Sequence, residues 1–347
     1  MMIKIVLFLL IGSAMNAAQG KEKNLPRVAQ WGRFETAFIS DQYYYDWVRD
    51  IRLHVEFTSP QGKKQTALAL WDGGTTWRVR FSPDCIGTWR YRTICNKKDN
   101  AGLHDRTGKF VCVPYRGDNP LYRHGELRLS GNRRFLRHAD GTPFLFLGDT
   151  APISPLLASK QEWSRYLAEC SRAGCNAVLF IPTHSDAIPK DARGHPAFTG
   201  EILIQIRADF FQRLDRYFDA VNEKGMIAAP ILLWAETGDK NPGYYLPEDQ
   251  QIVLAEYIFS RCNAHQAVWL LSGGQSAIEN ADVLQRIGSA VFGDASRRLA
   301  SLIPEPGERI EDLYANESWF TFNLFPRRED FSLRQYWMIR PARGAAE

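Results

Sequence analysis

The stretch Ile227–Leu233 reads Ile-Ala-Ala-Pro-Ile-Leu-Leu, and an amphipathic stretch, Glu248–Cys262, follows it. A short apolar run of this kind is typical of a strand covered on both faces. The same alternation recurs from residue 144 onward. The expected strands are Phe144–Leu147, Ala177–Ile181, Ile227–Leu233, Ala267–Leu271, Leu299–Ile303 and Phe320–Leu324, and the expected helices are Lys160–Ala173, Ala208–Lys224, Glu248–Cys262 and Ala277–Phe292.

Strands and helices in this order predict a parallel sheet, and the (β/α)₈ barrel is the commonest way to extend one. The α/β segment 144–347 supplies about six of the eight strands, so we expect an incomplete (β/α)₈ TIM-type barrel. A doubly wound open sheet is the alternative. Its cofactor-binding version is disfavoured because no Gly-rich dinucleotide fingerprint follows the first strand.

The chain before this segment has a period of two. Leu53, Val55 and Phe57 alternate with polar residues, and Asp72-Gly73-Gly74 is a typical hairpin turn. Short alternating strands at this spacing predict an immunoglobulin-like β-sandwich over residues 28–115. A linker with a small hairpin is expected at 116–143, between the sandwich and the barrel.

The first twenty residues have the features of a signal peptide. Lys4 precedes the apolar run Ile5–Ile11, and small residues follow at Ala14, Ala17 and Ala18. We therefore expect residues 1–20 to be removed and the protein to be secreted, periplasmic or held at the cell surface. No later stretch approaches transmembrane length, so no stable membrane span is expected after cleavage.

Composition excludes some classes of partner and cofactor. The 43 basic and 39 acidic side chains nearly cancel, and no dense Lys/Arg run is present, which argues against nucleic-acid binding. Among six cysteines, Cys95 ends one expected strand and Cys112 lies in the next, so a disulfide between them is predicted. The other four lack metal-like spacing with histidine, and we expect no metal and no cofactor.

Polar residues follow each expected barrel strand, where barrel enzymes carry their chemistry. These candidates are Asp149, Thr150, His184, Asp186, Trp234, Glu236, Gln275, Glu305 and Asn323. Asp149 could instead cap a helix, and Asp186 could be a solvated loop residue. A serine-hydrolase reading of Gly274-Gln275-Ser276 fails, because every histidine lies at or before His265 and the triad histidine must follow the serine.

Several motifs together bring one family into view. They are Phe135–Thr150, Phe211–Asp215 with Leu233-Trp234, Asn241-Pro242-Gly243 and Val268–Gly274. This set closely resembles the apiosidase-like glycoside hydrolase barrels. Leu70–Gly74 and Trp77–Pro83 are similar to the immunoglobulin-like module, of the domain of unknown function 5060 type, that often precedes such barrels.

The resemblance implies that the partner is a carbohydrate, such as the side chain of a plant-type polysaccharide, and that two carboxylates cleave the glycosidic bond with retention. These carboxylates must lie ~5–5.5 Å apart. Where the family's fourth-strand motif ends Gly-Gly-Asp, this chain has Gln275 after Gly273-Gly274. An amide has no proton to exchange near neutral pH. No segment is a candidate for the seventh or eighth strand, where the nucleophile is expected.

Three hypotheses follow. The chain could be an active glycosidase that uses Glu236, Glu305 or Asp186 as substitute carboxylates. It could be an inactive relative that keeps a sugar-binding cleft. It could also be shortened from an active parent. Gln275 favours the second hypothesis over the third, because shortening alone would not remove the acid/base residue.

Overall fold

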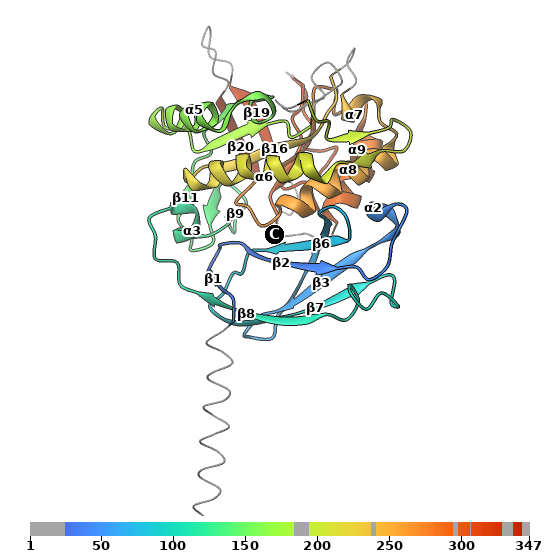
Figure 1. Cartoon of the computed structure of the whole chain (residues 1–347). Coiled ribbons are helices and arrows are strands. Elements are labelled where there is room, and N and C mark those ends of the chain that lie inside the picture. The colour runs from blue at the N-terminus through green and yellow to red at the C-terminus, as the bar shows by residue number, and fades with distance from the viewer. Residues whose placement is uncertain are drawn as a thin grey trace, which may run out of the picture.

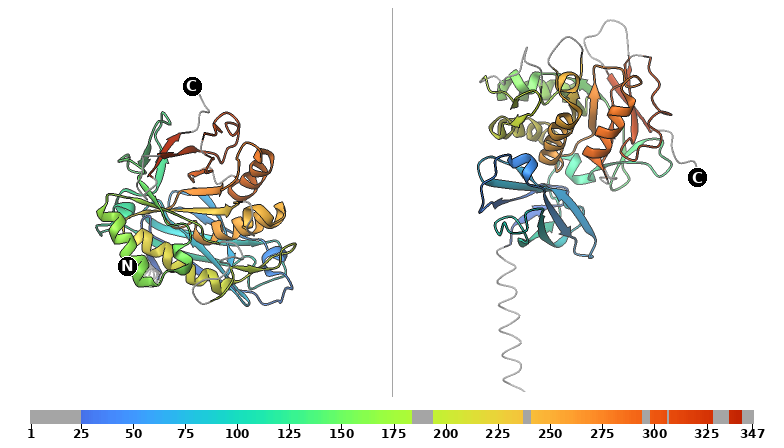
Figure 2. Two further views of the ribbon diagram at one scale, coloured as in Figure 1. Left: turned by 90° about the horizontal axis from the view of Figure 1, so that it is seen from above. Right: turned by 90° about the vertical axis from the view of Figure 1, so that its right-hand side faces the viewer.

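The computed structural model describes residues 25–183, 194–236, 241–293, 298–305, 307–327 and 336–341. The predicted signal peptide lies outside these residues. An N-terminal β module packs beneath a larger α/β module (Figures 1 and 2). Within the described part of the chain, no helix is long and apolar enough to cross a membrane.

The N-terminal module consists of two sheets that enclose an apolar core. The side chains of Leu53, Val55 and Phe57 point inward and are completely buried, which confirms the predicted period of two. The predicted turn at Asp72–Gly74 joins two strands of the smaller sheet. In spatial order the larger sheet contains β1 (Arg27–Ala29), β8 (Thr107–Val113), β7 (Gly87–Cys95), β3 (Leu53–Thr58) and β4 (Lys64–Leu68), and the smaller one β2 (Phe34–Ile39), β6 (Thr76–Phe81) and β5 (Leu70–Trp71).

The predicted Cys95–Cys112 disulfide is wrong. All six cysteines are free. Antiparallel pairing of β7 and β8 places Cys112 opposite Gly87, whereas Cys95 lies at the far end of β7 opposite Leu53. Eight residues of strand separate the two positions by about 27 Å. A disulfide requires Cα atoms about 4.4–6.8 Å apart.

A small antiparallel sheet connects the modules, and the predicted hairpin is part of it. It contains β9 (Leu127–Leu129), β10 (Leu136–His138) and β11 (Pro143–Phe144), and helix α3 (Pro120–His124) precedes it. The predicted first barrel strand, Phe144–Leu147, is therefore wrong. Phe144 belongs to the small sheet and Leu145 is exposed, so the barrel strand begins only at Gly148.

The larger module contains a seven-stranded sheet. Its first five strands are parallel, and β20 pairs antiparallel with both β12 and β19. Ala300 also bridges Phe320, so the two ends of the sheet approach each other. The spatial order is β18 (Ala300–Ser301), β17 (Trp269–Gly273), β16 (Ile227–Trp234), β13 (Ala177–Phe180), β12 (Gly148–Thr150), β20 (Tyr336–Pro341) and β19 (Phe322–Arg327).

Among the described residues, the long helices lie on one face of this sheet. Phe180 and Trp269 pack outward against the helices, whereas Leu179, Ile231 and Leu270 form a separate apolar cluster on the inner face. A doubly wound sheet needs helices on both faces. The long helices are α5 (Lys160–Arg172), α6 (Ala208–Glu223), α8 (Glu248–Cys262) and α9 (Ala281–Phe292), and the short elements are α2 (Trp47–Asp50), α4 (Ser154–Leu157), α7 (Pro242–Tyr245), β14 (Phe198–Thr199) and β15 (Gln205–Ile206).

Helix α5 illustrates how local sequence sets these boundaries. Ser159 accepts a hydrogen bond from the Glu162 amide, and the Glu162 side chain accepts one from the Ser159 amide. This capping box satisfies two amides that the first turn would otherwise leave without partners. Trp163 and Leu167 then recur at helical spacing and are buried against the sheet.

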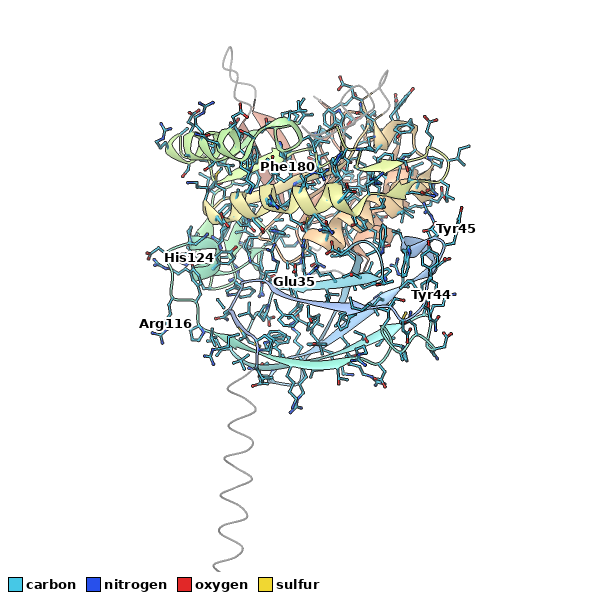
Figure 3. All side chains as sticks on the ribbon, in the orientation of Figure 1. Glu35, Tyr44, Tyr45, Arg116, His124 and Phe180 are labelled. Atoms are coloured by element: carbon cyan, nitrogen blue, oxygen red, sulfur yellow. The ribbon has the colours of Figure 1, made fainter. Side chains whose placement is uncertain are left out.

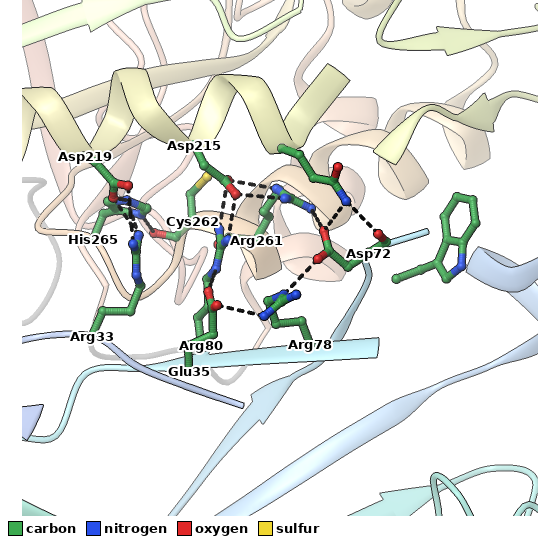
Figure 4. A network of polar contacts seen from close by, with 12 residues as sticks. Arg33, Glu35, Asp72, Arg78, Arg80, Asp215, Asp219, Arg261, Cys262 and His265 are labelled. Atoms are coloured by element: carbon green, nitrogen blue, oxygen red, sulfur yellow. Dashed lines mark hydrogen bonds and ion pairs between the residues drawn. The ribbon is translucent and has the colours of Figure 1, made fainter. Parts of the chain in front are cut away.

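A network of charged residues joins the two modules (Figure 4). Arg80 of β6 donates to both carboxylate oxygens of Asp215 on α6, at 2.8 and 2.6 Å. Arg261 of α8, which is 1% exposed, also donates to Asp215 and to Asp72. Burial lowers the pKa of Arg261, but its carboxylate and phenol neighbours outweigh this effect and raise that pKa overall.

Candidate functional site

Four residues meet at the carboxyl ends of β16 and β17. The Nε1 atom of Trp234 donates to Glu236 Oε2 over 3.2 Å, and the Nε2 atom of Gln275 donates to Ser272 Oγ over 3.1 Å. Glu236 is exposed, whereas Ser272 is buried. We refer to Trp234, Glu236, Ser272 and Gln275 as the strand-end cluster.

Two glycines allow this cluster to pack closely. A Cβ atom on Gly273 would lie 3.1 Å from Trp234 Cζ3 and 3.0 Å from Ile303 Cβ. Gly274 has a φ of +81°, and a Cβ atom there would lie 3.0 Å from both the Glu236 amide nitrogen and the indole. Side chains at either position would displace Trp234, so the Gly-Gly pair keeps the indole against the end of β17.

One buried polar residue contacts the cluster, and two others lie after or within other strands of the sheet. Asn241 is fully buried, and its Nδ2 atom donates to the Glu236 carbonyl over 3.2 Å. Within the described residues its Oδ1 atom has no hydrogen-bond partner, and the same holds for Thr183 Oγ1 after β13 and Asn323 Oδ1 in β19. Buried polar atoms normally have a partner. Those at a strand end can therefore accept or donate hydrogen bonds to a ligand.

Sequence reasoning did not select Asn241 as a site residue. The available signal was its position before Pro242, which begins α7. Gly243 then approaches the end of β16 so closely that a Cβ atom would lie 2.9 Å from the Leu233 and Trp234 carbonyl oxygens. This approach of α7 to β16 is a tertiary contact, and it places Asn241 beside Glu236.

Asp149 and Thr150, the first predicted pair, do not share this environment. Asp149 Oδ2 accepts hydrogen bonds from Tyr166 and Cys170 of α5 at 3.1 and 3.3 Å, and Oδ1 accepts one from the Thr150 amide. Burial, together with the carboxylate, raises the pKa of Cys170 to about 12. Asp149 thus faces the helix layer, and this orientation does not support a substrate-binding role.

Glu305, after β18, is exposed, and its amide donates to the nearby Glu308 carboxylate over 2.9 Å. Glu308, which sequence reasoning missed, also accepts hydrogen bonds from Ser276 Oγ at 2.5 Å and from the Ala277 amide at 3.1 Å. Partial burial raises the pKa of Glu308, but these hydrogen bonds outweigh it and hold the pKa below its ordinary value. Glu308 thereby connects the loops after β17 and β18.

The remaining predicted residues, His184 and Asp186, lie outside the described residues. Among the residues that the structure describes, no group of three or more His, Cys, Asp or Glu side chains could hold a metal ion.

Solved structures with a similar fold include proteins described as glycoside hydrolases. A protein from Bacteroides vulgatus ATCC 8482 assigned as a glycoside hydrolase has a TM-score of 0.69 and 23% identity, over 85% of this chain and 59% of its own. A family 5 glycoside hydrolase from the same organism has a TM-score of 0.51 and 19% identity, over 60% and 46%. This chain thus spans 59% of the length of the first relative and 46% of the length of the second. These similarities show a glycoside hydrolase-like fold.

Family comparison makes this assignment more specific. The model of the apiosidase-like catalytic domain matches residues 130–340, and that of the domain of unknown function DUF5060 matches residues 27–96. The chain belongs to the apiosidase-like family, as the motifs indicated. No curated protein matches it.

Proposed function

We propose that the chain is a carbohydrate-binding member of the apiosidase-like family that does not cleave glycosidic bonds by the two-carboxylate mechanism. Gln275 is the observation that carries this proposal. It occupies the position after Gly273-Gly274, and its amide donates to Ser272 Oγ. A glutamine cannot protonate a leaving oxygen, and loss of general acid catalysis typically costs ~10²–10⁴ in rate.

The proposed ligand is an oligosaccharide that resembles plant polysaccharide side chains. The indole of Trp234 offers an aromatic face at the strand ends, and Glu236 is exposed beside it. The buried oxygen atoms of Asn241 and Thr183 would bind sugar hydroxyl groups. A few placed polar groups among apolar walls are typical of small-molecule sites.

We also propose an architecture for the two modules and a location for the protein outside the cytoplasm. The two facing sheets of residues 27–113 are consistent with an immunoglobulin-like sandwich. We interpret the seven-stranded sheet as a (β/α)₈ barrel that lacks some of its β/α units, with β20 beside β12. Lys4, the run Ile5–Ile11 and the small residues after them support export from the cytoplasm.

A second candidate function is retaining hydrolysis by substitute carboxylates. The exposure of Glu236 favours it, because a nucleophile or acid must reach the substrate. Glu305 is exposed as well, after β18. Such chemistry requires two carboxylates ~5–5.5 Å apart across the anomeric carbon.

One experiment separates the two functions. The purified chain is incubated with apiose-containing and other plant-type glycosides, and both reducing-sugar release and ligand-induced change in Trp fluorescence are measured. We expect a fluorescence change that Trp234→Ala removes, without sugar release. Sugar release that disappears in Glu236→Ala would overturn the proposal and establish hydrolysis. An unchanged fluorescence with every glycoside would contradict sugar binding at the cluster.

A further inference from the structure

A cavity of about 570 Å³ lies between the two modules. Its walls come from Tyr45–Arg49 before and within α2, from Trp71–Gly73 at the β5–β6 turn, and from Leu203–Asp209 and Gln212 of the larger module. Small-molecule sites typically have volumes of about 300–1,000 Å³. None of the strand-end cluster residues lines this cavity, so it is a separate space.

The rim of this cavity exposes large apolar side chains. Tyr45 and Leu203, which line the cavity, are 90% and 52% exposed. Their chain neighbours Tyr43 and Ile202 are 81% and 84% exposed. Figure 3 shows Tyr45 at the outer edge of the molecule, level with the junction of the modules. The Tyr43 ring lies 5.5 Å from the ring of buried Trp47, nearly perpendicular to it. Clusters of exposed large apolar side chains commonly mark binding surfaces.

Hydrogen bonds between the modules hold this frame in place. Arg49 of α2 donates to the Ile204 carbonyl over 3.0 Å and to Asp46 over 2.8 Å. Gln250 Oε1 accepts hydrogen bonds from Arg49 Nη2 and from the Ile204 amide. The aromatic rim next to α2 and the aliphatic rim at the β14–β15 turn are therefore fixed relative to each other before any ligand binds. A site arranged in advance loses less entropy on binding.

The charged side chains that line the cavity are already paired. Asp46 pairs with Arg49, Arg207 pairs with Asp209, and Asp72 pairs with Arg78 and Arg261. Uncharged groups remain for a ligand. Gln212 donates to the Asp72 carbonyl over 2.8 Å, which leaves its Oε1 atom available within the described residues, and Gln205 is exposed beside it.

We propose that this cavity is a second carbohydrate site, which binds a neutral oligosaccharide. The C–H face of a pyranose ring packs on an aromatic ring such as Tyr45, and its hydroxyl groups bind uncharged amides such as Gln205 and Gln212. The paired charges disfavour a charged ligand, because binding one would break existing ion pairs or leave it unpaired. This site lies outside the strand-end cluster and goes beyond the proposed function.

The test is calorimetric titration of the full chain with soluble galactomannan, xyloglucan and arabinoxylan. We expect at least one to bind, and Tyr45→Ala to weaken that binding by about tenfold, because the variant removes the aromatic face on which the sugar ring packs. Phe135→Ala is the matched control, since Phe135 is a 45% exposed aromatic residue on the connecting hairpin. That variant should bind like the original chain.

Trp234→Ala distinguishes this site from the strand-end cluster. Weakening by Tyr45→Ala but not by Trp234→Ala supports the second site and contradicts the proposed function. Weakening by Trp234→Ala alone overturns the second site and leaves the proposed function standing. The second site is also overturned if none of the three polysaccharides binds, or if polygalacturonate, which is charged, binds more tightly than all of them.

Discussion

The junction between the modules and the strand-end region both bury polar groups. The two regions differ in whether these groups have hydrogen-bond partners. At the junction Arg80 and Arg261 are buried, Asp215 is partly buried, and each carboxylate oxygen of Asp215 accepts hydrogen bonds from both arginines. At the strand ends, Asn241 Oδ1 and Thr183 Oγ1 are equally buried and have no partner among the described residues. One region has used its polar atoms to join two modules. The other has polar atoms left for a ligand.

This difference separates structural from functional polar residues where residue type does not. Removing one member of a satisfied buried pair leaves an uncompensated charge, so the expected cost is in stability. Removing an atom that has no partner costs little stability, because no interaction is lost. Its effect should appear in binding.

The largest expected effect comes from Arg261→Ala. Arg261 is 1% exposed and is bound to Asp215 and Asp72, so the variant should lose about 3–5 kcal/mol of unfolding free energy. Urea unfolding followed by circular dichroism measures this loss. Arg286→Ala is the control, since Arg286 pairs with Glu248 on the surface, and its midpoint should barely move. Similar midpoints for both variants would show that the junction network adds no stability.

A matched pair of asparagines tests the comparison directly. Both are fully buried, but Asn100 is satisfied by Ser40, Tyr44 and the Leu103 amide, whereas Asn241 Oδ1 has no partner in the part of the chain that the structure describes. Asn100→Ala should cost about 1–3 kcal/mol of stability. Asn241→Ala should cost less and should weaken oligosaccharide binding about tenfold, the effect of about 1.4 kcal/mol. The distinction fails if Asn241→Ala is the more destabilising and leaves binding unchanged.

A smaller effect is expected from acid. Burial lowers the pKa of His265, although its hydrogen bond to Asp219 acts against this, and Arg33 also contacts the ring, at 2.9 Å. The unfolded chain therefore takes up a proton on His265 at a higher pH than the folded chain does. The contribution of His265 to the free energy of unfolding should be fully present above about pH 6.5 and should decrease as the pH falls below that value.

Thermal unfolding at pH 7.5 and 5.5 measures this dependence. In His265→Gln the decrease between these two pH values should be smaller than in the original chain. His104→Gln is the control, and it should keep the original decrease. An equal decrease in His265→Gln would show that His265 does not contribute. A further loss is expected at lower pH, because the pKa values of Asp215 and Asp219 are held low by their arginine and histidine partners despite burial.

The smallest expected effect is that of a reducing agent. All six cysteines are free, and burial raises the pKa of the Cys112 thiol to about 12. Dithiothreitol should leave the unfolding temperature unchanged. Thiol titration in denaturant without reductant should find all six cysteines. A lower unfolding temperature in reductant would reveal a disulfide that stabilises one of the two modules.

Local patterns were sufficient for most of the architecture. Alternation at Leu53, Val55 and Phe57 predicted strands with one buried face, and the buried run Ile227–Leu233 predicted a parallel strand. These features depend on the spacing of apolar residues along one segment, which the sequence displays directly. The family motifs around Phe135–Thr150 and Val268–Gly274 predicted the matching family.

Other features depended on which segments meet. The sequence placed Cys95 and Cys112 in neighbouring strands, but only the register separated them by the length of β7. Likewise, the motif at Gln275 and the exposed Glu236 could be proposed from strand ends. The contact of Asn241 with Glu236 could not be predicted from the sequence, because it depends on the packing of α7 against β16.

Local periodicity therefore determined the elements, the class of sheet and the position of the strand ends. Tertiary structure alone decided the state of the polar groups. Arg261 lies in the last turn of α8 and Asn241 directly precedes α7, and neither local sequence shows whether the polar atoms have partners. Arg261 meets two carboxylates from distant segments, whereas Asn241 Oδ1 meets none among the described residues. Partners far apart in sequence are chosen by packing, which no single segment encodes.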